Sequence, residues 1–180
     1  MSEIWNFIIK ILFQIGLYGR FILIFCSMYL LWDNNNLFIY YLYGKFIDLL
    51  LNLFLKGIFK QPRPLEDPEL FNTALKHSER FKFINGYPYD IFGMPSGYAE
   101  TTFYSTVFIY LALKNTKITL FYLLISLLTI YQRVNTKEHS FLQVIVGGIV
   151  GSIFGFFIYY IATKKITGKI RPKKDDNGPS

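Results

Sequence analysis

A Pro-Ser-Gly turn, Pro95-Ser96-Gly97, lies between two basic segments of the chain and is a candidate anion-binding site. Serine is a favoured N-cap and an uncharged run follows it, so we expect a helix to begin at Ser96. The start of a helix leaves backbone N–H groups unpaired and carries partial positive charge, which suits an anion. Gly97 would let a ligand approach the backbone closely.

The residues on either side of this turn have the types and the spacing that a phosphate site needs. Lys56 is followed after six residues by Arg63, and Arg133 is followed after five residues by His139. Guanidinium groups offer paired donors to phosphate oxygens, and an ammonium adds a point charge. A neutral imidazole can attack phosphorus and form a covalent intermediate, which makes His139 the candidate nucleophile. The set therefore predicts displacement at a phosphate ester, with charge stabilised on three equatorial oxygens.

Long uncharged runs indicate that the elements carrying these residues are membrane helices. The chain has 180 residues, of which 52% are hydrophobic. The runs at 101–113, 118–131 and 141–162 contain no charged residue, and each is close to the length that crosses a bilayer. We predict an all-α fold, a polytopic membrane bundle of about six helices. The expected helices are 4–17, 18–32, 37–56, 96–113, 117–132 and 139–163.

The first two of these helices have an alternative, which is one long bent helix over 4–32. Lys10, Gly16, Gly19 and Arg20 interrupt the apolar stretch and favour two short helices. In that arrangement Arg20 would extend its side chain towards the lipid headgroups.

The polar connection over 57–92 is too long for a passive link, and loops of this size usually serve a site. We predict one membrane-embedded domain over 1–163, with 57–92 as its active-site loop, and a basic, disordered tail over 164–180. Counting crossings places this loop, the Ser96 turn and the segment 133–139 on one face of the membrane. The tail emerges on the opposite face.

The distribution of charge indicates the orientation and the partners. Dense positive charge directly after the last span favours a cytoplasmic tail, so the site would face the lumen or the extracytoplasmic space, with the endoplasmic reticulum as the favoured organelle. The net charge is +7, but most cations lie at span ends, in loops and in the tail. Membrane lipids are therefore the expected partners, and nucleic acid is not. The sequence does not indicate an oligomeric state.

The order Lys-x6-Arg-Pro, Pro-Ser-Gly, Arg-x5-His resembles the type 2 phosphatidic-acid phosphatase family, the lipid phosphate phosphatases related to vanadium haloperoxidases. By motif the resemblance covers roughly residues 56–143. It implies hydrolysis of a lipid-linked phosphate through a phosphohistidine at His139, without a cofactor. No metal is implied either, and the sequence offers none of the clustered Asp and His ligands of a two-metal phosphatase. The phosphate-binding residues that it implies are Lys56, Arg63, Ser96, Gly97 and Arg133.

Two positions depart from the family pattern. The family continues Pro-Ser-Gly with a histidine, the general acid, where this chain has Tyr98. The family usually places Asp four residues after the nucleophile, where this chain has Gln143, whose side-chain carbonyl could accept the ring N–H of His139. The Gln form, followed by glycines over 147–155 that we expect to pack closely against another helix, is nearest to dolichyl-diphosphatase-like and sphingosine-phosphate phosphatase members.

Tyr98 leaves three outcomes open, because a phenol is a much weaker acid than an imidazolium near neutral pH. The substrate could have a leaving group that needs little protonation, which favours a polyprenyl diphosphate over a monophosphate. His77, the only other histidine, could supply the proton instead. The alternative function is a catalytically impaired family member that binds lipid phosphates.

Overall fold

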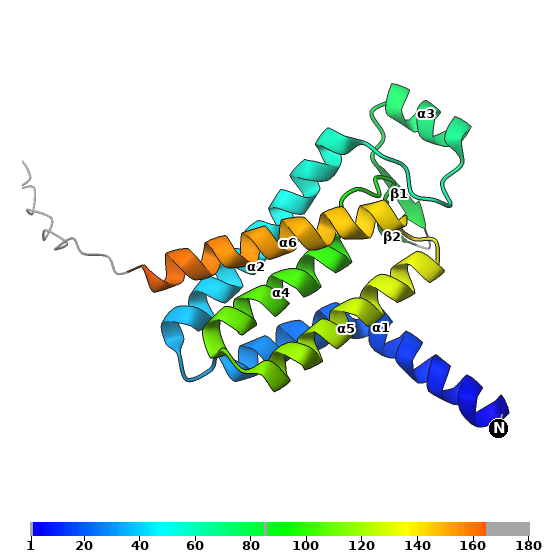
Figure 1. Ribbon diagram of the computed structural model, residues 1–180. Coiled ribbons are helices and arrows are strands. Elements are labelled where there is room, and N and C mark those ends of the chain that lie inside the picture. The colour runs from blue at the N-terminus through cyan, green and yellow to red at the C-terminus, as the bar shows by residue number, and fades with distance from the viewer. Residues whose placement is uncertain (1, 85, 165–180) are drawn as a thin grey trace, which may run out of the picture.

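The computed structural model describes residues 2–84 and 86–164, and within them it shows a bundle of long helices with a small polar cap at one end (Figure 1). The predicted all-α fold with six helices is confirmed, with one small hairpin added. The elements are α1 (Ser2–Leu30), α2 (Asn35–Phe59), α3 (Pro68–Lys76), β1 (Phe81–Ile84), β2 (Tyr87–Asp90), α4 (Gly97–Leu113), α5 (Thr116–Asn135) and α6 (Phe141–Thr163). Of these, α1, α2, α5 and α6 are long and apolar enough to cross a membrane. The 17 residues of α4 lie at the lower end of the spanning range.

The prediction of two short helices before residue 33 is wrong, because α1 is one continuous helix of 29 residues. Its N-terminal half projects away from the bundle, and the helix bends where it joins the other helices (Figure 1). Gly16 and Gly19 do not break the helix but let it approach α5. A Cβ added at Gly16 would lie 2.5 Å from the backbone oxygen of Leu128, so the two helices touch closely at this point.

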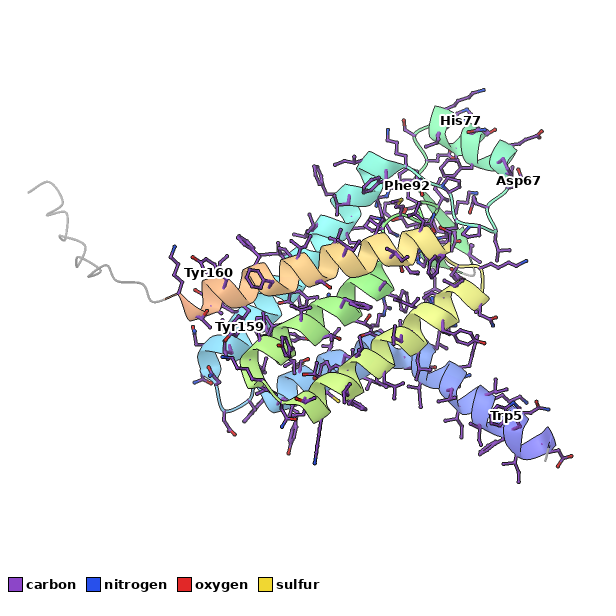
Figure 2. The ribbon with its side chains drawn as sticks, viewed as in Figure 1. Trp5, Asp67, His77, Phe92, Tyr159 and Tyr160 are labelled. Carbon is purple, nitrogen blue, oxygen red and sulfur yellow. The ribbon has the colours of Figure 1, made fainter. Side chains whose placement is uncertain are left out.

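The connection over 57–92 is an ordered cap and not an irregular loop. Asp67 caps the start of α3, since its side chain accepts the backbone N–H groups of Glu69 and Leu70, and Pro68 fixes the first helical position. The strands β1 and β2 pair antiparallel. Figure 2 labels Asp67 and His77 at the two ends of α3, with Phe92 nearer the bundle. Phe71, Ala74, Ile91 and Phe92 form a small core inside the cap.

The helix α4 runs through the centre of the bundle and packs against α6 along a row of glycines. Gly147, Gly151 and Gly155 lie on one face of α6, and a Cβ added at any of them would collide with backbone atoms of α4 or of the turn before it. The close packing predicted for 147–155 is therefore confirmed. This contact holds Ser96, which precedes α4, beside the start of α6.

A side chain at Gly151 should separate α4 from α6 and destabilise the protein. The nearest atoms to an added Cβ at Gly151 are backbone atoms of Glu100, which cannot move aside as a side chain can. We expect Gly151→Val to lower the free energy of unfolding by about 1–3 kcal/mol or more, as overpacking usually does. The thermal unfolding temperature in detergent should fall as well. The matched control is Gly148→Ala, whose nearest neighbour would be the Phe103 ring at 3.5 Å. Equal melting temperatures for the two variants would contradict the close contact between Gly151 and the backbone of α4.

The predicted tail over 164–180 lies outside the described residues, apart from Lys164, which is the C-cap of α6.

Candidate active site

A cavity of about 380 Å³ lies between α1, α2, the start of α4 and the cap. It brings together most of the residues that the sequence analysis selected, from four separate segments of the chain. Those in its lining are Lys56, Arg63, Gly97, Tyr98 and His139. Arg133 stacks on Tyr98 at the edge of the cavity, and Ser96 is fully buried next to Gly97. Gln143 does not line the cavity. A separate apolar cavity, lined by Phe25 and Phe121 among others, contains none of the predicted site residues.

His139 lies in the short connection between α5 and α6 and is only 2% exposed. Its Nδ1 is 2.9 Å from the backbone oxygen of Gly93. A carbonyl oxygen can only accept, so Nδ1 carries the hydrogen and Nε2 keeps a free lone pair. Burial lowers the pKa of His139 to about 3, and the positive charges of Arg63 and Lys56 act in the same direction. At neutral pH the ring is therefore uncharged and has the form that a nucleophile needs.

His139 should remain neutral through the pH range in which an ordinary histidine takes up a proton. Because its pKa in the folded protein lies below the value of about 6.5 for an unfolded chain, the neutral form should persist as the pH falls from about 8 to about 4. The linked stability is complete above about pH 6.5 and decreases as the pH falls towards 3, since the unfolded chain binds the proton first. Nitrogen-15 NMR of the imidazole in detergent measures the protonation state directly.

The chain has two histidines, so His77→Gln leaves His139 as the only source of imidazole signals. His77 is exposed at the end of α3 and does not line the cavity. The structure therefore does not support His77 as the proton donor that the sequence left open. A His139 signal that titrates near pH 6.5 would show that the buried, cation-flanked environment described above is wrong.

Lys56 is held at the cavity by a carboxylate that the sequence analysis missed. Its side chain lies in the last turn of α2, and its Nζ is 3.3 Å from Oδ2 of Asp90. Arg80 also donates to Asp90, with Nη2 2.9 Å from the same oxygen. Burial alone would raise the pKa of Asp90, but the bonds from Arg80 and the charge of Lys56 outweigh it and hold this pKa below its usual value. Asp90 is therefore ionised and positions Lys56.

Arg63 is fixed by two segments of the chain at once. Its Nε donates to the backbone oxygen of Asp90 at 3.0 Å, and its Nη1 donates to Oε2 of Glu138 at 2.9 Å. These bonds leave its Nη2 without a protein acceptor among residues 2–84 and 86–164. A guanidinium held in this way presents a donor to an anion without losing side-chain entropy on binding.

Ser96 is the N-cap of α4, as predicted. Its backbone N–H and hydroxyl are not arranged as expected for an anion site at the helix start. Its backbone N–H is not available to an anion, because it donates to the backbone oxygen of Gln143 at 3.0 Å. Its hydroxyl makes no capping bond, and its Oγ is buried without a hydrogen-bond partner in the described part of the chain. Ser96 is fully buried and does not line the cavity, so its binding to phosphate stays a prediction. Gly97 keeps the helix start open, since a Cβ there would lie 3.0 Å from Oδ1 of Asn52.

The expectation that Gln143 orients the ring of His139 is wrong. The side-chain oxygen of Gln143 accepts the backbone N–H of Ser140 in a capping box at the start of α6. Its Nε2 donates to the backbone oxygen of Pro62 at 2.9 Å. Gln143 therefore anchors the chain beside Arg63, while the backbone of Gly93 takes the orienting role. No sequence pattern could have marked Gly93, because a backbone carbonyl is present at every residue.

Tyr98 lies between two arginines. The guanidinium carbons of Arg20 and Arg133 are each 4.1 Å from the centroid of its ring, which is cation–π geometry. Arg133 also donates through Nε to Oε1 of Gln132 at 2.5 Å. Arg20 also lines the cavity, a position that the sequence analysis did not predict. The signal that could have identified it is an ionisable residue inside an apolar run, which by default marks a functional site.

Buried polar groups lie in and behind the inner wall of the cavity, and they are only partly paired with one another. Asp48 forms an ion pair with Lys45, one turn away on α2. Asn52, on the next turn, donates to Oε2 of Glu100 at 2.5 Å. The ion pair uses Oδ2 of Asp48, while Oδ1 of Asp48 and Oε1 of Glu100 are buried without a hydrogen-bond partner among the described residues.

Taken together, the cavity has a neutral imidazole with a free nitrogen and several cations, and the Ser96 hydroxyl is buried beside it, outside the lining. These are the groups needed to bind a tetrahedral oxyanion and to attack its central atom. Comparison with known protein families agrees with this chemistry, because the model of the PAP2 superfamily matches residues 37–167, well over half of the chain. No curated protein and no solved structure gave a significant match.

Proposed function

Because the chain belongs to the PAP2 superfamily, and is thus an integral membrane protein with phosphatase activity on phosphate esters, we propose that it hydrolyses a lipid-linked phosphate or diphosphate. We favour a polyprenyl diphosphate as substrate and a phosphohistidine on His139 as the intermediate. The observation that carries the proposal is the bond from Nδ1 of His139 to Gly93, which leaves Nε2 free in a cavity lined by Lys56 and Arg63.

In the proposed reaction the terminal phosphoryl group binds to Lys56, Arg63 and Arg133, with the hydroxyl of Ser96 as a neutral donor. Nε2 of His139 attacks phosphorus, and the bond to the leaving oxygen breaks with its electron pair. Water then hydrolyses the phosphohistidine and releases inorganic phosphate. Neither a metal nor a cofactor takes part in this scheme, so a chelator should leave the rate unchanged.

The cavity favours a lipid over a soluble ester. Leu49 and Leu53 on α2 line it beyond Lys56, and Leu49 is 56% exposed on the outer surface of the bundle. An acyl or prenyl chain can therefore leave the cavity towards the bilayer while the headgroup stays among the cations. The lack of an imidazole at Tyr98 favours a diphosphate, because a leaving phosphate is a far weaker base than an alkoxide.

The test is release of inorganic phosphate by purified protein in detergent from a panel of lipid monophosphates and diphosphates. Polyprenyl diphosphate should be hydrolysed faster than phosphatidate or a polyprenyl monophosphate of the same chain length. Faster hydrolysis of phosphatidate would refute the diphosphate preference while leaving the phosphatase assignment in place.

A second function, binding of lipid phosphates without turnover, is supported by one observation. Tyr98 stands where the family has its general acid, and its ring stacks between two arginines. This arrangement can position cations for binding a lipid phosphate without any proton transfer. If wild type and His139→Ala are both inactive on every lipid in the panel while both bind diphosphate lipids, the binding function is the correct one.

We also propose that the cavity faces the lumen or the extracytoplasmic space, that the C-terminal tail is cytoplasmic, and that the endoplasmic reticulum is the compartment. The dense charge after α6 supports this orientation. An N-glycosylation acceptor inserted at the exposed Gly86, between β1 and β2, tests it, because cytoplasmic acceptors are not modified.

A further inference from the structure

Arg20 is the cation of the cavity that no motif accounts for. It lies on α1, outside the residues matched by the family model, and it nevertheless lines the same cavity as His139. The glycines described above place it there. Gly16 and Gly19 face α5, so the two helices approach closely, and Arg20 follows directly after them.

The guanidinium of Arg20 is held near a second cation, and no carboxylate among residues 2–84 and 86–164 forms an ion pair with it. Its carbon and that of Arg133 are each 4.1 Å from the same ring centroid, so the two carbons lie no more than twice that distance apart. Arg63 and Arg80, in contrast, are each paired with a carboxylate. The Nε of Arg20 is buried and has no hydrogen-bond partner among the described residues. Because Nε has no accessible surface, an anion in the cavity can reach Arg20 only through its outer nitrogens, Nη1 and Nη2.

The structure shows no ion pair between Arg20 and a carboxylate among the described residues, although Oδ1 of Asp48 is also buried without a hydrogen-bond partner there. Asp48 also lines the cavity, but its ion pair is with Lys45. Arg20 and His139 line the same cavity, so an anion that binds both must extend beyond the phosphoryl group at His139. A diphosphate fits this requirement, because its two phosphate groups share a bridging oxygen and each can face one cation.

We propose that Arg20 binds the second phosphate group of a lipid diphosphate, the one that leaves with the lipid, and thereby sets the preference for diphosphates. This inference rests on the proposed function and deepens it. Nε2 of His139 forms a bond to the terminal phosphorus as the bond from that phosphorus to the bridging oxygen breaks. The electron pair stays on the bridging oxygen of the lipid monophosphate, and Arg20 balances its charge, so no proton is needed from position 98. Tyr98 then acts as the platform that positions Arg20 and Arg133.

The test compares Arg20→Gln with wild type on a polyprenyl diphosphate and on the monophosphate of the same chain. We expect kcat/KM for the diphosphate to fall about 10- to 100-fold, the range for one lost hydrogen bond to a charged group. The monophosphate should change less than about threefold, because its phosphoryl group does not reach Arg20. Arg20→Lys should recover part of the loss. The matched control is Lys10→Gln, an exposed cation on the projecting half of the same helix, which should leave both rates unchanged.

An equal fall with both substrates would overturn the inference and show that Arg20 supports the fold or the general site. Failure of the proposed function looks different, because wild type itself would then release no phosphate from any lipid. If wild type releases no phosphate, a binding measurement still tests the role of Arg20. Arg20→Gln should weaken binding of a prenyl methylene-diphosphonate, and binding of the matching prenyl phosphonate should stay the same. Equal affinity of wild type for inorganic diphosphate and for the lipid analogue would assign the site to free diphosphate and refute the lipid.

Discussion

Replacing His139 with alanine should reduce phosphate release from the preferred lipid by at least about 10⁴-fold, because the covalent route is lost with the nucleophile. The same variant should retain substrate binding, since Lys56, Arg63 and Arg133 do not depend on the imidazole for their position. Arg63 and Lys56 are held by Glu138 and Asp90, and Arg133 stacks on Tyr98. The measurements are phosphate release at saturating substrate and the Kd for the intact lipid.

The covalent intermediate gives an independent check of the same prediction. Substrate labelled in its terminal phosphate should label wild type, and acid should remove the label, as is typical of a phosphorus–nitrogen bond. His139→Ala should not be labelled. The matched control is His77→Ala, which removes the other histidine of the chain from an exposed position. Label on His139→Ala, or loss of activity in His77→Ala, would identify a different nucleophile.

Replacing Arg63 with glutamine should lower kcat/KM by about 10²–10³-fold, the usual loss when one preorganised donor to the reacting group is removed. Arg63→Lys should fall between this variant and wild type. The three donors of a lysine ammonium share one nitrogen, so they lack the planar fork by which Arg63 bonds the Asp90 carbonyl and presents another donor to phosphate in a fixed geometry. Lys60→Gln is the matched control, because Lys60, the C-cap of α2, lies between Lys56 and Arg63 in the chain but is exposed and does not line the cavity.

A second readout separates a direct role of Arg63 from a structural one. The charge of Arg63 lowers the pKa of His139, after the larger effect of burial. In Arg63→Gln the pKa of His139 should therefore rise, and imidazole NMR should detect it. An unchanged pKa together with full activity would show that Arg63 lies away from the reacting groups.

The sequence by itself determined the membrane bundle and most of the cavity. Apolar runs of spanning length predicted α2, α4, α5 and α6, but neither the continuity of α1 nor the cap helix α3. The number of spans between two motifs predicted which polar segments lie on the same face of the membrane. Lys56, Arg63 and His139 could be assigned together for this reason, although 83 positions separate the first from the last. The glycine row of α6 was also readable, because small residues spaced four apart favour close helix packing.

Only the tertiary structure decided how the side chains of the cavity are partnered. The acceptor for His139 is the carbonyl of Gly93, 46 positions away, and Gln143 serves the start of α6 instead. Arg20 enters the cavity because α1 stays continuous through its glycines and packs on α5. These outcomes depend on how closely helices distant in sequence approach one another. Residue type and local spacing restrict which groups a segment offers, but the distance between two segments is set by packing over the whole bundle.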